Sequence, residues 1–190
     1  EHATERNIRT AYRHYQQGQD AEIARAFHDA YCHAETQIEM IGVWDTVKAL
    51  GFRLPVLWRW SKDPHGFHND ELGPHVKNGY HALALEETRD VFAPVLWSCP
   101  DGFNGRVEQM WFRGAHGDVG GQLGGFEAAR PLANLSLVWM LEKAEDCGLP
   151  LPQDWRMRFP VDPGAPSVGT WRGWGKIFLL RSRRPVGKDP

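Results

Sequence analysis

The segment Val107–Gly121 reads V-E-Q-M-W-F-R-G-A-H-G-D-V-G-G, an apolar run followed by a histidine in a glycine-rich turn. A short apolar run bounded by turn residues is typical of a buried strand. The carboxyl ends of the strands of an α/β sheet open onto the ligand crevice, so a polar side chain at such an end can act on a ligand. The segment therefore predicts a strand of an α/β fold that brings His116 to a candidate active site.

A second apolar run, Gln37–Trp44, ends in the same way, in Asp45 and Thr46. Its nearly continuous apolar character is typical of a strand buried on both faces of a parallel sheet. If the two strands are neighbours in such a sheet, Asp45 and His116 emerge at one edge within reach of each other. An acid and then a histidine, in that chain order, are two members of a serine hydrolase triad.

The roles of these two residues follow from the chemistry of a general base. A catalytic histidine needs a carboxylate on one ring nitrogen and the hydroxyl of a nucleophile on the other. Asp45 fits the first role and His116 is the base itself. The spacing alone also allows an alternative, in which His116 is a loop residue without function and Asp45 caps a turn.

Residues that flank the pair are expected to contact the substrate. Glycines let the chain turn sharply and bring its backbone close to a ligand. Asp118 is interpreted first as a turn or cap residue. The predicted substrate contacts close to the pair are Trp44, Thr46, Gly114, Asp118, Gly120 and Gly121.

The composition bounds the class of protein. A chain of 190 residues with 42% hydrophobic residues suits one domain, or a large part of a larger one. The net charge of −2 gives no reason to expect a nucleic-acid partner, and the basic cluster Arg181–Arg184 is interpreted as a solvated end. No cofactor is expected.

The sequence also bears on location. No apolar stretch approaches the roughly 20 residues that span a bilayer, and the N-terminus lacks the features of a signal peptide. Three widely separated cysteines, Cys32, Cys99 and Cys147, favour reduced thiols that fill the interior in a cytosol-like compartment. These observations predict a cytoplasmic location.

Helices are expected on both sides of the first strand. Residues 1–36 form a helical lead-in, with helices over 4–18, capped by Thr4, and 20–31, capped by Asp20. Pro74 suits the first turn of another helix, which would carry Val76, Tyr80 and Leu83.

Later segments predict a helix and a terminal strand. Within residues 37–150, which hold the acid and histidine blocks, the run 135–144 predicts a deeply covered helix with Asn134 as its cap and Gly148 as its stop. Val91–Trp97 is a short apolar piece broken by Pro94. Residues 151–190 form a Pro-, Gly- and Trp-rich extension that ends in a strand at Ile177–Leu180.

Residues 51–70 read as a long loop or cap insertion, and long ordered loops tend to be functional. Trp58 and Trp60, with Leu54 and Leu57, are predicted to form an apolar substrate entrance that could contact a membrane surface. Six side chains nearby, His65, His68, Asp70, Glu71, His75 and His81, include H-x-x-H spacing that a metal could use. Because H-E-x-x-H and a second cluster are missing, a loop rich in histidine is the favoured interpretation, and no metal site is predicted.

Three blocks together resemble a known family. They are I-G-V-W-D-T-V-K-A-L-G (41–51), Y-H-A-L-A-L-E-E-T-R (80–89) and V-E-Q-M-W-F-R-G-A-H-G-D-V-G-G (107–121). In this order and spacing they resemble the type VI secretion phospholipase effectors and their α/β-hydrolase relatives, over roughly residues 5–150. The resemblance implies a doubly wound α/β-hydrolase fold, a Ser-Asp-His triad and activity on lipid esters, with Asp45 as the acid and His116 as the base.

One part of the family pattern is missing from the sequence. The family carries its nucleophile in a G-x-S-x-G elbow before the W-D-T-V block, and no such motif occurs here. The five serines, Ser61, Ser98, Ser136, Ser167 and Ser182, do not stand in a glycine-flanked turn between a strand and a helix. We therefore expect a partial, mostly parallel α/β-hydrolase sheet with flanking helices, corresponding to the C-terminal half of the domain and inactive by itself.

The predicted function is a serine-type carboxylic ester hydrolase acting on lipid or phospholipid esters, with its serine outside this chain. The alternative is a non-catalytic binding module on the same scaffold, because fold alone does not fix function. Besides a lipid or small ester, the resemblance implies an immunity or secretion protein as partner, and export without an N-terminal signal.

Overall fold

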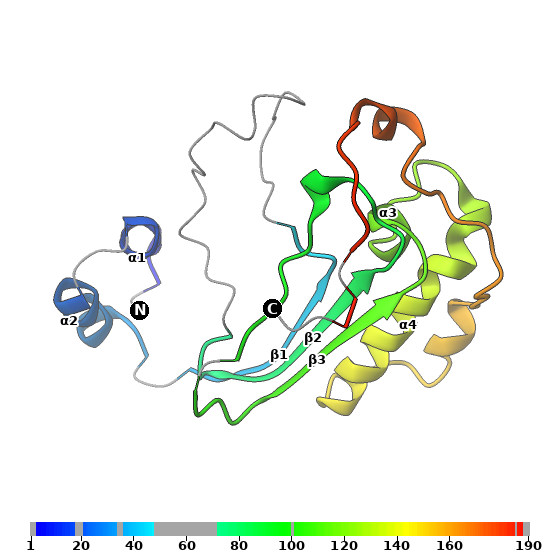
Figure 1. The fold of residues 1–190 in the computed structure, drawn as a ribbon. Coiled ribbons are helices and arrows are strands. Elements are labelled where there is room, and N and C mark those ends of the chain that lie inside the picture. The colour runs from blue at the N-terminus through cyan, green and yellow to red at the C-terminus, as the bar shows by residue number, and fades with distance from the viewer. Residues whose placement is uncertain are drawn as a thin grey trace. The chain divides into compact units, whose positions relative to one another are not determined.

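The computed structural model describes residues 3–17, 21–33, 36–47, 72–99, 101–184 and 186–187 (Figure 1). The chain divides into two compact units. One comprises Glu1–Gln37 with Lys62–Asn69, and the other comprises Ile38–Ser61 with Asp70–Pro190.

The first unit contains the helices α1 (Glu5–Gln17) and α2 (Ala21–Tyr31), which confirms the two predicted helices. Thr4 caps α1, since its Oγ1 accepts a hydrogen bond of 3.2 Å from the Asn7 amide. The ring of Phe27 lies 5.3 Å from that of His14 and joins the two helices. The predicted cap of the second helix, Asp20, lies outside the described residues.

The second unit is built on a parallel sheet of β1 (Ile38–Trp44), β2 (Val76–Ala84) and β3 (Arg106–Phe112), in that spatial order. Both pairings are parallel. Together with its flanking helices, this sheet is consistent with the α/β class (Figure 1). The strands predicted at Gln37–Trp44 and Val107–Phe112 are confirmed as β1 and β3, but β1 is exposed or half-buried along its length and not buried on both faces as expected.

The predicted helix after Pro74 is wrong, because Val76–Ala84 forms the central strand β2. Val76, Tyr80 and Leu83 fit a helical spacing, but His81 and Ala82 between them are buried as well. A strand covered on both faces shows no alternation in its sequence, so its apolar residues can mimic a helical period. The acid-bearing and histidine-bearing strands are therefore separated by β2 and are not direct neighbours in the sheet.

Helix α4 (Arg130–Asp146) covers one face of this sheet. Its Met140 belongs to a buried cluster with Tyr80, Ala82, Ala84 and Val119. Gly42 of β1 permits this contact, since a Cβ atom there would lie 2.6 Å from the Met140 sulfur. Close packing of α4 against β1 and β2 therefore holds this helix against the sheet that carries the site.

Helix α4 is longer than predicted. It begins at Arg130, with Pro131 in its first turn, so Asn134 is not its cap. Asn134 is buried inside the helix and donates a hydrogen bond of 2.8 Å to the Pro160 carbonyl oxygen. The helix ends before Gly148, which adopts a φ of +92°, as the predicted stop requires. Several of its apolar side chains, including Leu137, are only half-buried, so it is less deeply covered than expected.

The C-terminal segment differs from its prediction in two ways. A 3-10 helix, Gly173–Ile177, and a single bridge between Arg89 and Arg181 replace the predicted strand at Ile177–Leu180. Leu179 is 77% exposed, so this segment has no buried face of the kind that defines a strand in the sheet. The basic cluster is not a solvated end either, because the Arg184 side chain is only 4% exposed.

Two smaller expectations are settled by the described residues. Asp90–Phe92 forms a 3-10 helix, and the rest of the apolar piece around Pro94 is irregular. Cys32 and Cys99 are exposed and Cys147 is half-buried, so the first two do not fill the interior. In the described part of the chain, no helix has the length and apolar character needed to cross a membrane.

Candidate active site

Asp45 lies directly after β1 in an unusual backbone conformation. Its φ is +43°, the only positive value at a non-glycine residue among those described, and aspartate tolerates this region better than most residues. Its amide donates a 2.7 Å hydrogen bond to the Ala82 carbonyl oxygen, and its Oδ1 accepts one of 2.8 Å from the Ala84 amide. The end of β2 thus holds both the backbone and the fully buried carboxylate of Asp45.

His116 starts the short helix α3 (His116–Val119), which follows β3. Its Nδ1 lies 2.7 Å from Asp45 Oδ2. Because an ionised carboxylate can only accept, we assign a proton to Nδ1, which in the neutral imidazole leaves the lone pair on Nε2. The His116 side chain is 28% exposed, and among the described residues none bonds to Nε2. The structure brings the two side chains together across β2, with one nitrogen of the imidazole left for a further partner.

Glu87 fixes the backbone of His116. Its Oε2 accepts a hydrogen bond of 3.1 Å from the His116 amide, and its side chain is fully buried. Arg89 pairs with the same carboxylate through two bonds, Nε to Oε1 at 2.8 Å and Nη2 to Oε2 at 2.6 Å. Sequence reasoning missed Glu87, and the only signal was its position beside Arg89 just after an apolar run.

An aromatic stack supports the imidazole from its face. The Phe92 ring lies 4.9 Å from that of His116 at 30°, and the Arg89 guanidinium lies 4.2 Å from the Phe92 ring centre. Such cation–π and ring contacts restrict the orientation of the histidine ring. Arg89 therefore acts on both sides of His116, through Glu87 on its backbone and through Phe92 on its ring.

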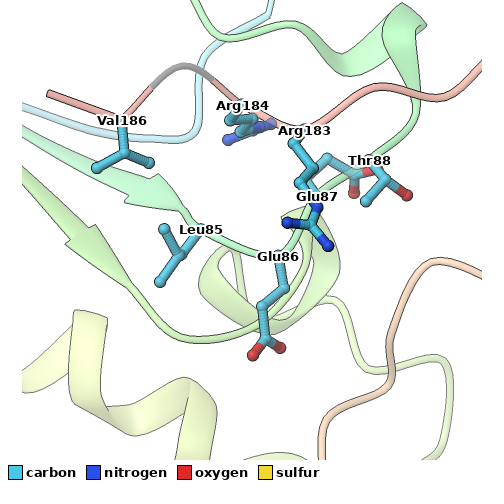
Figure 2. A pocket seen from close by; sticks show the side chains of 7 residues that line it. All are labelled: Leu85, Glu86, Glu87, Thr88, Arg183, Arg184 and Val186. Atoms are coloured by element: carbon cyan, nitrogen blue, oxygen red, sulfur yellow. The ribbon is translucent and has the colours of Figure 1, made fainter. Parts of the chain in front are cut away.

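Asp45 also meets an arginine from the C-terminal segment. Arg184 Nη1 donates to Asp45 Oδ1, and Nη2 donates to Oδ2 at 2.9 Å. Figure 2 shows Arg183 and Arg184 together on that segment, beside Glu86, Glu87 and Thr88, which follow β2. These side chains line a pocket of about 340 Å³ with Leu85 and Val186. Sequence reasoning missed Arg184, because 139 residues separate it from Asp45 and no local pattern links them.

Both buried carboxylates are held in their ionised form. Burial alone raises the pKa of Asp45, but the hydrogen bonds from His116 and Arg184 and the positive charge of Arg184 bring that pKa below its usual value. Burial likewise raises the pKa of Glu87, and the bonds and charge of Arg89 bring it below its usual value. The site therefore carries two matched carboxylate–guanidinium pairs at neutral pH.

His81 lies under the site in β2 and is fully buried. Its Nε2 accepts a 3.1 Å hydrogen bond from the Thr46 amide, which holds the residue after Asp45. Burial lowers the pKa of His81 to about 4, outweighing the nearby Asp45 charge. His81 is thus a neutral acceptor that shapes the turn after β1.

Asp118, one of the predicted substrate contacts, is fully buried and bonded within the chain. Its Oδ2 accepts from the Ala115 amide at 2.9 Å and from Ser167 Oγ at 2.6 Å, and its Oδ1 accepts from the Val168 amide at 2.7 Å. Gly114 adopts a φ of +111°, and a Cβ there would lie 2.6 Å from that of Asp118. Both residues shape the histidine turn from inside.

Three other predicted contacts share one pocket. Trp44, Gly120 and Gly121 line a space of about 330 Å³ with the first turns of α4. Trp44 precedes Asp45 directly, and the Gly120 amide donates a 2.9 Å hydrogen bond to the His116 carbonyl oxygen. This pocket therefore adjoins the elements that carry both members of the pair.

Several predicted residues lie outside the described part of the chain. They are Leu54, Leu57, Trp58, Trp60, His65, His68, Asp70 and Glu71. Of the remaining members of the histidine-rich cluster, His75 lies in the turn just before β2 and His81 lies in the middle of β2. Among the described residues, no group of three or more His, Cys, Asp or Glu side chains is arranged to hold a metal ion.

Residues 1–143 match the family model of the T6SS phospholipase effector Tle1-like catalytic domain. The chain belongs to this family. The matched region includes Asp45, Glu87 and His116 and ends before the C-terminal segment that carries Arg184. No significant match was found among curated proteins or among solved structures.

Proposed function

We propose that this chain supplies the acid and the base of a Ser-Asp-His hydrolase that cleaves lipid esters. The contact of 2.7 Å between His116 Nδ1 and Asp45 Oδ2, at the carboxyl edge of a parallel sheet, is the observation that carries this proposal. Membership in a phospholipase effector family supports a lipid ester as the substrate. An α/β-hydrolase fold accounts for both the sheet edge and the order of acid and histidine.

In the proposed reaction, His116 Nε2 takes the proton of a serine hydroxyl as that oxygen attacks the ester carbonyl. Asp45 holds the imidazole by its Nδ1 proton and stabilises the imidazolium that forms. His116 then donates the proton to the departing alkoxide, giving the alcohol and an acyl enzyme. Water, deprotonated by His116, attacks the acyl carbonyl, and His116 returns the proton to the serine oxygen as the fatty acid leaves.

The nucleophilic serine is proposed to lie outside this chain. Ser136, Ser167 and Ser182 each donate their hydroxyl to another acceptor, namely Val119 O, Asp118 Oδ2 and Asp90 Oδ1. Ser98 does not stand in a turn between a strand and a helix, and Ser61 lies outside the described residues. The amide donors of an oxyanion hole would accompany the serine, because one of them is the amide that follows the nucleophile.

The pocket formed by Trp44, Gly120 and Gly121 is the proposed site for part of the substrate. Thr46, Trp58 and Trp60 remain proposed substrate contacts as well, the last two as an apolar entrance at a membrane surface. Membership in an effector family supports export without an N-terminal signal and a secretion or immunity protein as partner.

His116→Ala in the full-length protein tests the proposal. We expect hydrolysis of phospholipid vesicles to fall by about 1,000-fold or more, because loss of a triad member removes general-base catalysis. His75→Ala is the matched control, since His75 is exposed in the turn just before β2. Hydrolysis near the parental rate in His116→Ala, with an unchanged melting curve, would contradict the assignment. Vesicle binding by an unaltered protein that hydrolyses no ester would favour the non-catalytic alternative.

A further inference from the structure

The C-terminal segment places one guanidinium on the buried carboxylate that holds His116. We propose that Arg184 is a positioning residue, which fixes the Asp45 carboxylate in the orientation that receives His116 Nδ1. This inference rests on the proposed function of the Asp45–His116 pair. It concerns a residue that lies beyond the 143 residues matched by the family model.

The two terminal nitrogens of the Arg184 guanidinium are fully used by this arrangement. Its two terminal nitrogens carry four N–H groups, and four acceptors receive them. Two acceptors are Asp45 Oδ1 and Oδ2. The other two are the carbonyl oxygens of Ala84 at 2.7 Å and Phe92 at 2.6 Å. With its side chain 4% exposed, Arg184 therefore has a defined place inside the protein and is not a surface charge that happens to lie near an acid.

The Asp45 carboxylate accepts four hydrogen bonds, which together fix the orientation of its plane. Oδ1 accepts from Ala84 N and from Arg184, while Oδ2 accepts from His116 and from Arg184. Rotation about the Cβ–Cγ bond of Asp45 would break the two parallel hydrogen bonds to the planar guanidinium of Arg184. Without Arg184, only one backbone amide and the histidine itself would define the orientation of the carboxylate.

Arg184 also ties together the parts of the chain that surround His116. Ala84 ends β2, which separates the strands of Asp45 and His116. Phe92 carries the ring that lies against the imidazole. One guanidinium therefore links the acid, the end of the central strand and the residue that supports the base.

The segment that carries Arg184 is itself anchored. The Ser182 amide donates to the Thr88 carbonyl oxygen at 2.9 Å, and the Asp90 amide donates to that of Leu180 at 3.1 Å. Arg181 Nη2 donates to the Gly175 carbonyl oxygen at 2.9 Å. These bonds limit the movement of the backbone that precedes Arg184. The neighbouring Arg183 is exposed and lies beside the same pocket, which makes it a matched control (Figure 2).

The charge of Arg184 has a separate consequence. A positive charge beside Asp45 opposes protonation of the Asp45–His116 pair, because it offsets the negative charge that attracts the proton. The other titratable and charged groups around the pair are His81, which is buried, and the Glu87–Arg89 ion pair. Geometry and charge can be separated experimentally, since lysine keeps the charge but lacks the planar fork.

The test uses Arg184→Gln, Arg184→Lys and Arg183→Gln in the full-length protein, with ester hydrolysis measured against pH. Loss of orientation is expected to lower kcat about 100-fold in both Arg184 variants, with KM nearly unchanged. In Arg184→Gln the acidic limb of the kcat/KM profile should also move to higher pH, because the pair protonates more easily. Arg184→Lys should leave that limb in place, and Arg183→Gln should match the unaltered protein.

A second measurement does not depend on catalysis. The proton on His116 Nδ1, shielded by its bond to Asp45, should give a low-field NMR signal in the unaltered protein and in Arg183→Gln. Exchange with water should broaden this signal or remove it in the Arg184 variants. An unchanged signal and an unchanged kcat in Arg184→Gln would overturn the inference.

Failure of the proposed function and failure of the inference about Arg184 are distinguishable. If the unaltered protein hydrolyses no ester, the proposed function is contradicted, and the NMR signal still decides whether Arg184 positions Asp45. Circular dichroism shows whether each variant folds. If Arg184→Gln does not fold, Arg184→Lys decides the inference by the same two measurements.

Discussion

Charge at the candidate site is balanced residue by residue. Asp45 is paired with Arg184 and Glu87 with Arg89, and both carboxylates are fully buried. Taking a charge out of water is costly unless a partner and further hydrogen bonds compensate it. Backbone amides supply those further bonds, from Ala84 to Asp45 and from His116 to Glu87. The same interactions that make burial tolerable also hold the acid and the base in place.

His81 is the uncompensated titratable group of this region. Its Nδ1 has no hydrogen-bond partner in the described part of the chain, and burial lowers its pKa from 6.5 to about 4. The unfolded chain therefore binds a proton at a pH where the folded protein does not. Stability that is present above pH 6.5 is lost as the pH falls toward 4.

We expect the free energy of unfolding to decrease by about 2 kcal/mol between pH 7 and pH 5 on account of His81 alone. Urea unfolding of the unaltered protein and of His81→Gln at several pH values measures this. The variant should lose most of that dependence, and His75→Gln, at an exposed position, should keep it. Asp45 and Glu87, whose pKa values are lowered, lose their stabilising effect only at more acid pH. Equal pH slopes in His81→Gln and the unaltered protein would contradict the prediction.

At the scale of elements, the strands at the edges of the described sheet were predictable and the central one was not. β1 and β3 are bounded apolar runs, whereas in β2 the polar residues Lys77, Asn78 and His81 interrupt the apolar ones. His81 and Gly79 are accommodated there by contacts with β1, β3 and Trp97, which the local sequence does not reveal. Burial by segments distant in the sequence is therefore what makes Val76–Ala84 a strand.

The candidate site was predictable to the same extent. Asp45 and His116 follow the two recognisable strands, so their position at one edge could be inferred. Glu87 follows β2, whose sequence predicts a helix, and Arg184 comes from a segment without regular structure. Their roles depend on long-range contacts, which periodicity and spacing do not encode.

Asp118 links two elements and gives a test at this scale. It joins α3 to residues 167–169 through the Val168 amide at 2.7 Å and the Gly169 amide at 3.3 Å. Asp118→Asn replaces one acceptor by a donor that faces other donors. We expect a loss of about 2 kcal/mol in the free energy of unfolding. Amide exchange at Val168 and Gly169 should also become faster.

The control for this link is Asp162→Asn, at an exposed site where the carboxylate accepts from the Gly164 amide at 2.7 Å. Its effect should stay below about 0.5 kcal/mol. Hydrogen exchange followed by mass spectrometry and thermal melting measure both variants. The prediction is wrong if Asp118→Asn leaves exchange over residues 167–169 unchanged.

At the scale of the whole molecule, the sheet has an unequal distribution of burial. Val76 and residues 79–84 of β2 are buried, whereas β1 is exposed or half-buried along its length. In the part of the chain that the structure describes, β1 pairs with β2 only. An edge strand with apolar side chains and free backbone groups is a template for pairing with another chain.

The 190-residue chain is therefore expected to self-associate through β1 as its concentration rises. Ile38 begins this strand and is 42% exposed. Ile38→Lys should weaken the association, because a charge on an edge strand opposes pairing with a second apolar edge. Ile8→Lys makes the same change of charge on α1, at a residue that is 61% exposed, and should leave the association intact. Sedimentation velocity over a range of concentrations distinguishes the two variants. If both lower the association equally, general exposed apolar surface and not the edge of β1 is the cause.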